Sequence, residues 1–115
     1  MGEYALYLDD IRHPPHTGEN WVLCRTVEAM HSVLEANGIP SLASFDYELG
    51  HTDPGNTGYN AVRCFLGFLL ENPPKGEKLE VEVRLHTSSS IGAKRMAQLL
   101  KEHSSACADV GIRLL

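Results

Sequence analysis

The chain has 115 residues, of which 43 % are hydrophobic and 22 % are charged. These values are typical of one globular domain and exclude a coiled coil, a collagen-like chain and a disordered chain. The formal net charge of −5 argues against binding duplex DNA through a broad basic face. No apolar run approaches the ~20 residues of a membrane span, and the first residues lack the pattern of a secretion signal. We therefore expect a single cytoplasmic domain over residues 1–115, with no membrane partner.

The cysteines Cys24, Cys64 and Cys107 are odd in number and far apart in the chain. Their spacing fits neither a disulfide framework nor a zinc site. We expect them to be small buried hydrophobic residues of a protein in a reducing compartment.

The first part of the chain predicts two strands and one helix. Residues 4–8 form a short apolar run typical of a strand that is buried on both faces. Residues 11–20 contain two prolines and a glycine and must form a loop. Residues 21–25 read as a second strand, after which Thr26 caps a helix that ends before Gly38.

The second part repeats this alternation of strands and helices. Residues 41–46 predict a third strand, and residues from about 59 to 71 predict a second helix. Residues 79–86 alternate apolar and polar side chains, as in a fourth strand with one more exposed face. A third helix is expected over about 91–106, and a final strand over 110–115.

This order predicts an α/β fold, a flavodoxin-like parallel sheet of five strands and about three helices. Residues 11–20 then take the place of the first helix as a loop, and we expect both faces of the sheet to be covered. Ligands of such sheets bind outside the carboxyl ends of the strands. The polar residues that end the strands are therefore the candidates for function.

Carboxylates end two of the strands that this order makes neighbours. Asp9 and Asp10 follow the first strand, and Asp46 ends the third. Three carboxylates at one edge need a counter-ion, and Mg²⁺ or Mn²⁺ bound to carboxylates, water and phosphate would supply it. The alternative is that each acid only caps a turn. Together, the three predict a metal or phosphate site.

Several polar residues near this edge have more than one interpretation. Thr87 and Ser88 follow the fourth strand and either bind a phosphoryl oxygen or cap the next helix. Arg12 either binds phosphate or pairs with Asp10. His86 ends the fourth strand as a general acid or base, as a hydrogen-bond organiser, or as a plain surface histidine.

Three blocks of the sequence resemble the cyclic-phosphate processing receiver-like domains, which are found widely in bacteria and their phages and are related to two-component receiver domains. The first block is Leu-Asp-Asp-Ile-Arg, followed by the Pro-Pro loop and Trp21. The second is Ser-Phe-Asp-Tyr-Glu-Leu-Gly with a later Thr-Gly-Tyr-Asn, and the third is His-Thr-Ser-Ser-Ser-Ile-Gly-Ala-Lys-Arg-Met. They span residues 8–96 in the family's order.

The resemblance implies roles for the residues that match. Asp9 and Asp10 correspond to an acidic pair that binds Mg²⁺, Asp46 to a phospho-accepting aspartate, and Thr87 to a hydroxyl that binds a phosphoryl oxygen. It also implies a phosphorylated nucleotide or RNA end as the partner, and processing of terminal cyclic phosphates as the activity.

The chain departs from the family's pattern at four positions. Tyr47 replaces a histidine and Glu48 an aspartate, while Ser89 replaces an asparagine and Asn60 an aspartate. The last strand also lacks the lysine that a receiver uses in switching. These departures argue against signalling by phosphorylation and weaken the case for full catalytic competence.

Two functions follow from these observations. The first is a Mg²⁺-dependent phosphohydrolase or cyclic phosphodiesterase in which Asp46, His86 and Arg12 are catalytic. The second is a catalytically weak receiver-like module that binds a nucleotide, a protein partner or a second copy of itself. The intact acidic trio favours the first, and the altered residues around it favour the second.

Overall fold

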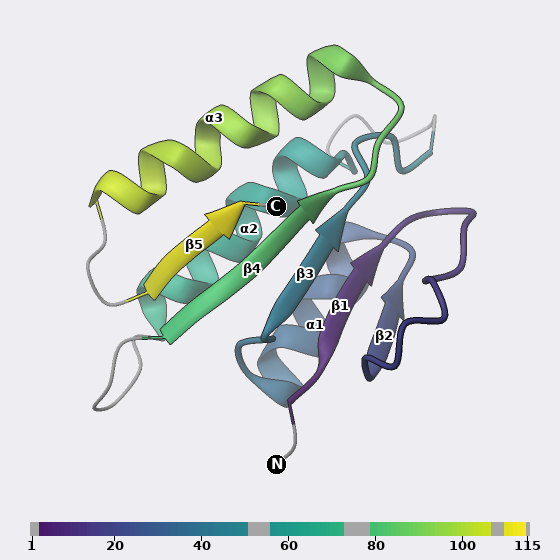
Figure 1. Ribbon diagram of the computed structural model, residues 1–115, viewed down its shortest axis with the longest axis horizontal. Helices are drawn as coiled ribbons and strands as arrows, with labels where there is room; N and C mark the ends of the chain where they lie inside the picture. The colour runs from purple at the N-terminus through teal and green to yellow at the C-terminus, as the bar shows by residue number, and fades with distance from the viewer. Residues whose placement is uncertain (1–2, 51–55, 73–78, 107–109, 115) are drawn as a thin grey trace.

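The computed structural model describes residues 3–50, 56–72, 79–106 and 110–114. Its elements in chain order are β1 (Ala5–Leu8), β2 (Trp21–Cys24), α1 (Val27–Asn37), β3 (Leu42–Phe45), α2 (Gly58–Glu71), β4 (Leu79–Leu85), α3 (Ser90–Ala106) and β5 (Val110–Leu114). The five strands are all parallel and lie in the order β2-β1-β3-β4-β5 (Figure 1). The predicted α/β fold, with three helices and a loop between the first two strands, is therefore confirmed.

The ends of the elements follow the predicted signals to within one residue. The Thr26 hydroxyl accepts a hydrogen bond from the N–H of Ala29 at 3.0 Å, so it caps α1 as expected. Gly38 ends α1 at a positive φ of 83°, which glycine adopts without steric cost, and its N–H donates to the Leu34 carbonyl at 2.8 Å. Local chemistry thus decides where the elements begin and end.

One hydrophobic core lies between the sheet and the helices. Helices α1 and α2 lie behind the sheet in Figure 1, and α3 packs against α2 and β5. Each helix contributes fully or almost fully buried residues to the same core: Met30, Leu34, Phe65, Leu69, Met96 and Leu100.

The expectation that both faces of the sheet are covered is met only in part by the described residues, because all three helices lie on one face. The connections through α1, α2 and α3 all advance in one direction along the strand order, from β2 towards β5. Because parallel crossovers are right-handed, they place all three helices on the same face. We call the opposite face the helix-free face.

The connection from β1 to β2 runs in the opposite direction, so the same handedness places it on the helix-free face. This connection contains two prolines and forms no helix. Figure 1 shows it as the purple segment that follows β1 and passes beside β2. Among the residues that the structure describes, the helix-free face is therefore covered only in part, by this loop.

Two further expectations concern the cysteines and membrane-spanning helices. Cys24 is a free, buried thiol and Cys64 is free and half-buried, whereas Cys107 lies outside the described residues. None of the helices that the structure describes is both long and apolar enough to span a membrane.

Candidate metal and phosphate site

The candidate site lies where the helix-free face meets the C-terminal ends of the strands. The pairing between strands continues one residue past β3 and β4, because the N–H of Asp46 donates to Leu8 and the N–H of His86 to Phe45, each at 3.0 Å. Side chains two residues apart on a strand share a face. Two successive rows of side chains follow: Tyr7, Ser44 and Arg84 in the first, and Asp9, Asp46 and His86 in the second.

The predicted carboxylate Asp9 is buried and held by its neighbours. Only 1 % of its surface is exposed. Its Oδ1 accepts hydrogen bonds from the N–H groups of Ile11, at 2.9 Å, and Arg12, at 2.8 Å. Burial acts to raise the pKa of Asp9, but these donors and His86 outweigh it and hold that pKa below its ordinary value. Asp9 is therefore a fixed carboxylate at the start of the loop.

His86 connects the two rows of side chains. Its Nε2 lies 3.0 Å from Asp9 Oδ2, and its Nδ1 lies 2.7 Å from Ser44 Oγ. The ring stacks on Tyr7, with centroids 4.5 Å apart and planes inclined by 7°. Burial lowers the pKa of His86 despite the nearby carboxylates. A neutral imidazole that donates to Asp9 and accepts from the Ser44 hydroxyl satisfies both contacts.

Asp46 lies opposite this pair, with 9 % of its surface exposed. Its Oδ1 accepts a hydrogen bond from the N–H of Tyr47 at 2.8 Å. The backbone there packs tightly against the start of α2, since a Cβ on Gly58 would lie 2.1 Å from the Asp46 carbonyl oxygen. The glycine therefore allows the close approach that fixes the position of Asp46.

These residues could hold a metal ion. One donor atom each from Asp9, Asp46 and His86 lies within 4.8 Å of the others. Asp9 and Asp46, but not His86, also border a cavity of about 180 Å³, the acidic pocket, which is lined by Asp9, Asp10, Ile11, Arg12, Asp46, Glu48, Gly50 and Ser88. Four of these side chains are carboxylates, and Arg12 is the single lysine or arginine among them. Oxygen donors around uncompensated negative charge suit Mg²⁺ or Mn²⁺, and an imidazole is also accepted by Mn²⁺.

The structure separates the two aspartates of the predicted pair. Asp10 is half-buried and lines the acidic pocket, but it is not part of the closest group of donor atoms among the described residues. His86 is in that group instead. The three predicted ligands Asp9, Asp10 and Asp46 thus share one pocket at unequal depth.

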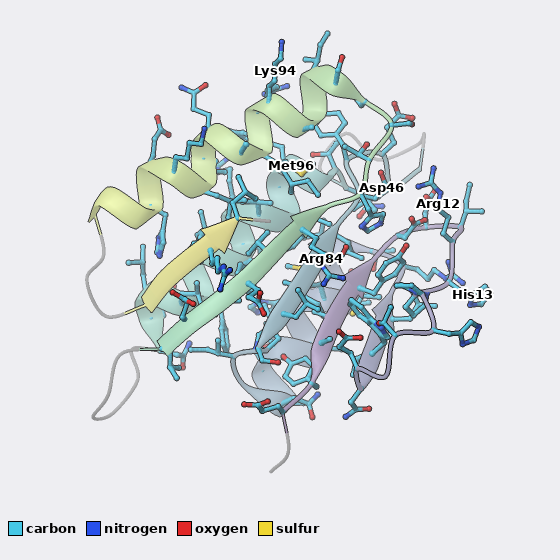
Figure 2. All side chains as sticks on the ribbon, in the orientation of Figure 1. Arg12, His13, Asp46, Arg84, Lys94 and Met96 are labelled. Atoms are coloured by element: carbon cyan, nitrogen blue, oxygen red, sulfur yellow. The ribbon has the colours of Figure 1, made fainter. Side chains whose placement is uncertain are left out.

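The loop that begins at Asp9 is held by two arginines. Arg12, which is exposed, donates from its guanidinium to the His86 carbonyl at 3.2 Å. No ion pair between Arg12 and Asp10 occurs in the part of the chain that the structure describes. The guanidinium of Arg25 donates to the carbonyls of Asp9, at 3.3 Å, and Arg12, at 3.1 Å. Figure 2 shows Arg12 beside Asp46 at this end of the sheet.

The hydroxyl residues that follow β4 make different contacts. Thr87 Oγ1 accepts from the N–H of Ser89 at 3.1 Å, and Ser89 Oγ accepts from the N–H of Gly92 at 3.0 Å, so Ser89 caps α3. Ser88 is exposed and lines the acidic pocket, whereas Thr87 is not among the residues that line it. His86, rather than Thr87, pairs with the end of β3 beside Asp46.

Residues 4–102 match the family model described as the cyclic-phosphate processing receiver domain. The chain belongs to this family. The match covers all the residues of the acidic pocket. A search of curated proteins and a search of solved structures each found no match.

Within this receiver domain, Tyr47 stands where the family pattern led us to expect a histidine. Its hydroxyl accepts from Arg95 at 3.2 Å, and a Cβ on Gly92 would lie 2.3 Å from its ring. Tyr47 therefore packs closely on the first turn of α3. This contact ties the segment after Asp46 to the segment after His86.

Sequence reasoning missed two residues that contact His86. Ser44 and Tyr7 each lie two positions before a predicted ligand, on the strands that end at Asp46 and Asp9. The alternation of side chains along a strand places them on the ligand face, next to the site. That signal was present, but it becomes useful only when one knows which face lacks helices.

Proposed function

We propose that this receiver domain acts on a phosphate ester in the acidic pocket with the help of a divalent cation, and that it processes the cyclic phosphate end of an RNA or nucleotide. The observation that carries this proposal is the approach of donor atoms of Asp9, Asp46 and His86 to within 4.8 Å of one another, beside a pocket whose lining has an excess of carboxylates. The family's description supplies the class of substrate.

In this proposal Asp9 and Asp46 hold Mg²⁺ or Mn²⁺, and Asp10 supports the ion at the pocket wall. The bound cation would neutralise charge on the phosphoryl oxygens. Asp9 is suited to this role because its backbone hydrogen bonds keep it charged and fixed. Asp46 has one oxygen hydrogen-bonded to the backbone, which leaves the other free to bind.

Arg12 and Ser88 lie at the pocket's rim, where they can contact the remaining phosphoryl oxygens. The Thr87 hydroxyl accepts a hydrogen bond from the N–H of Ser89, and this bond would have to break before Thr87 could contact the phosphate. Opening a cyclic phosphate with water forms one new P–O bond and breaks one ribose P–O bond. One proton of the water ends on the released ribose oxygen, and in this proposal His86, whose Nε2 lies 3.0 Å from Asp9, would pass it.

The experiment follows adenosine 2′,3′-cyclic monophosphate by ³¹P NMR with Mg²⁺, with Mn²⁺ and with a chelator. The expected result is metal-dependent conversion of the cyclic diester into a monoester, abolished by Asp46→Asn. Glu80→Gln is the matched control, because Glu80 is an exposed carboxylate at the other end of β4. Metal binding without turnover would support the binding module instead.

A further inference from the structure

A second cavity lies on the helix-free face, next to the acidic pocket. Its volume is about 550 Å³, within the range of small-molecule sites. We call it the aromatic–arginine pocket, and its lining residues are Tyr7, His13, Pro15, Trp21, Ser44, Arg84, Leu85 and His86. We infer that this pocket binds the nucleoside and phosphate of a nucleotide without the help of a metal. The choice of a nucleotide as the ligand rests on the proposed function. The pocket itself and its affinity for a nucleotide in the absence of metal can be tested independently of that function.

The charge of this pocket is opposite to that of the acidic pocket. None of its lining residues is a carboxylate, and Arg84 projects into it from β4. Arg84 is half-buried and makes no hydrogen bond or ion pair with any residue that the structure describes, although its charge helps to lower the pKa of Glu19. Figure 2 shows Arg84 on the face turned to the viewer, with His13 on the loop beside it. A half-buried guanidinium without a bonded partner is suited to a phosphate group.

An aromatic wall faces this cation. Trp21 is half-buried and lines both this pocket and the neighbouring cavity of the 11–20 loop. Its ring meets Tyr7 edge-on at 5.5 Å and 82°, and its Nε1 donates to Thr17 Oγ1 at 3.2 Å. Neither contact is a parallel stack on a face of the indole. A nucleobase can stack on such a ring, as bases do in proteins that bind single strands.

The aromatic–arginine pocket and the acidic pocket lie on either side of the contact between His86 and Asp9. His86 lines the former, and its Nε2 is 3.0 Å from Asp9, which lines the latter. Ser44 Oγ, 2.7 Å from the other ring nitrogen, also borders the aromatic–arginine pocket. A nucleotide seated against Trp21 and Arg84 would therefore have its phosphate beside His86. In this inference the aromatic–arginine pocket binds the part of the substrate that is too large for the small acidic pocket.

The test uses the fluorescence of Trp21, the one tryptophan of the chain. Adenosine 2′,3′-cyclic monophosphate is titrated in the presence of a chelator, so that the acidic pocket holds no metal. Saturable quenching is expected, and Arg84→Gln should weaken the affinity about tenfold or more, as expected for loss of a charge-assisted hydrogen bond. Arg113→Gln is the matched control, since Arg113 is exposed on the same face and pairs with the residue two positions before Arg84. It should leave the affinity within about twofold, because Arg113 does not line the pocket and an exposed surface charge contributes little.

Circular dichroism and thermal unfolding establish that Arg84→Gln remains folded. Absence of quenching, or equal weakening by Arg84→Gln and Arg113→Gln, would overturn the inference. So would quenching that requires Mg²⁺ and disappears in Asp46→Asn, because the nucleotide would then bind at the acidic pocket alone. Metal-dependent turnover that survives in Arg84→Gln would also count against this pocket while leaving the proposed function intact.

Discussion

The Nε2 of His86 lies 3.0 Å from the Oδ2 of Asp9, although the two residues are 77 positions apart in the chain. The contact joins the ends of β1 and β4, which are separated in the sheet by β3. Because His86 also contacts Ser44 on β3, one imidazole holds the ends of three strands together. The same group of residues that fixes the sheet edge therefore forms the candidate site.

Substitution of the adjacent residues Asp9 and Asp10 should change the free energy of unfolding by very different amounts. Asp9→Ala removes an acceptor for two backbone N–H groups and for His86, so it should lower the free energy of unfolding by about 1.5–3 kcal/mol, as for hydrogen bonds to charged groups. Asp10→Ala, at a half-buried position whose side chain makes no hydrogen bond with any residue that the structure describes, should change it by about 0.5 kcal/mol or less. Urea unfolding measures both, and equal losses would contradict the role given to Asp9.

Gly58 should be required for the position of Asp46. A Cβ at Gly58 would lie 2.1 Å from the Asp46 carbonyl oxygen, which belongs to backbone and cannot swing away. Gly58→Ala should therefore cost about 1–3 kcal/mol, as in other overpacked cores. Gly67→Ala on the same helix meets no atom within 4 Å and should stabilise the protein by up to about 1 kcal/mol. Thermal unfolding of the two variants tests this, and a Gly58→Ala protein as stable as Gly67→Ala would refute it.

The contact of Tyr47 with α3 should appear as coupling between two substitutions. Gly92→Ala places a Cβ 2.3 Å from the Tyr47 ring and should cost about 1–3 kcal/mol in the wild-type background. In a Tyr47→Ala background the ring is absent, so the cost of Gly92→Ala should be smaller by about 0.5 kcal/mol or more. A double-mutant cycle by urea unfolding measures the difference, and strict additivity would show that the two do not touch.

Tyr4 should contribute to the loss of stability at alkaline pH. Burial, helped by the Cys24 thiol, raises the pKa of Tyr4 from 10.0 to about 12. The folded state thus favours the neutral phenol, whose hydroxyl donates to the Gly38 carbonyl. This stabilisation is complete below pH 10 and is lost as the pH rises towards 12. Comparing urea unfolding of Tyr4→Phe and wild type across this range should show their stability difference shrinking, and a constant difference would contradict the assignment.

The fold was predictable from the sequence because its signals are local. The cap at Thr26 and the glycine at Gly38 mark the ends of α1, and the apolar run before Asp9 marks β1. The prediction of two covered faces was met only in part, because the covering of each face depends on topology. Only the direction of each crossover in the sheet decides which face a helix covers, and no local pattern encodes that direction.

The candidate site was predictable only in part. Asp9, Asp10 and Asp46 could be placed at one edge because parallel strands end together. The contacts of His86 with Asp9 and Ser44 depend on the register of β4 against β3, which the sequence leaves open. The role of Ser89 as the cap of α3, ahead of its neighbours Thr87 and Ser88, likewise depends on where the helix begins.

The most direct test of the central claim is a titration with Mg²⁺ followed by amide NMR, on the wild-type protein and on Asp46→Asn. The account predicts saturable shifts at the amides of Asp9, Asp10, Asp46 and His86, with affinity reduced at least about tenfold in Asp46→Asn, since loss of a carboxylate ligand weakens a hard-cation site. Glu80→Gln should behave as wild type. Unchanged spectra at millimolar Mg²⁺, or identical shifts in Asp46→Asn, would show that the acidic pocket is not a metal site.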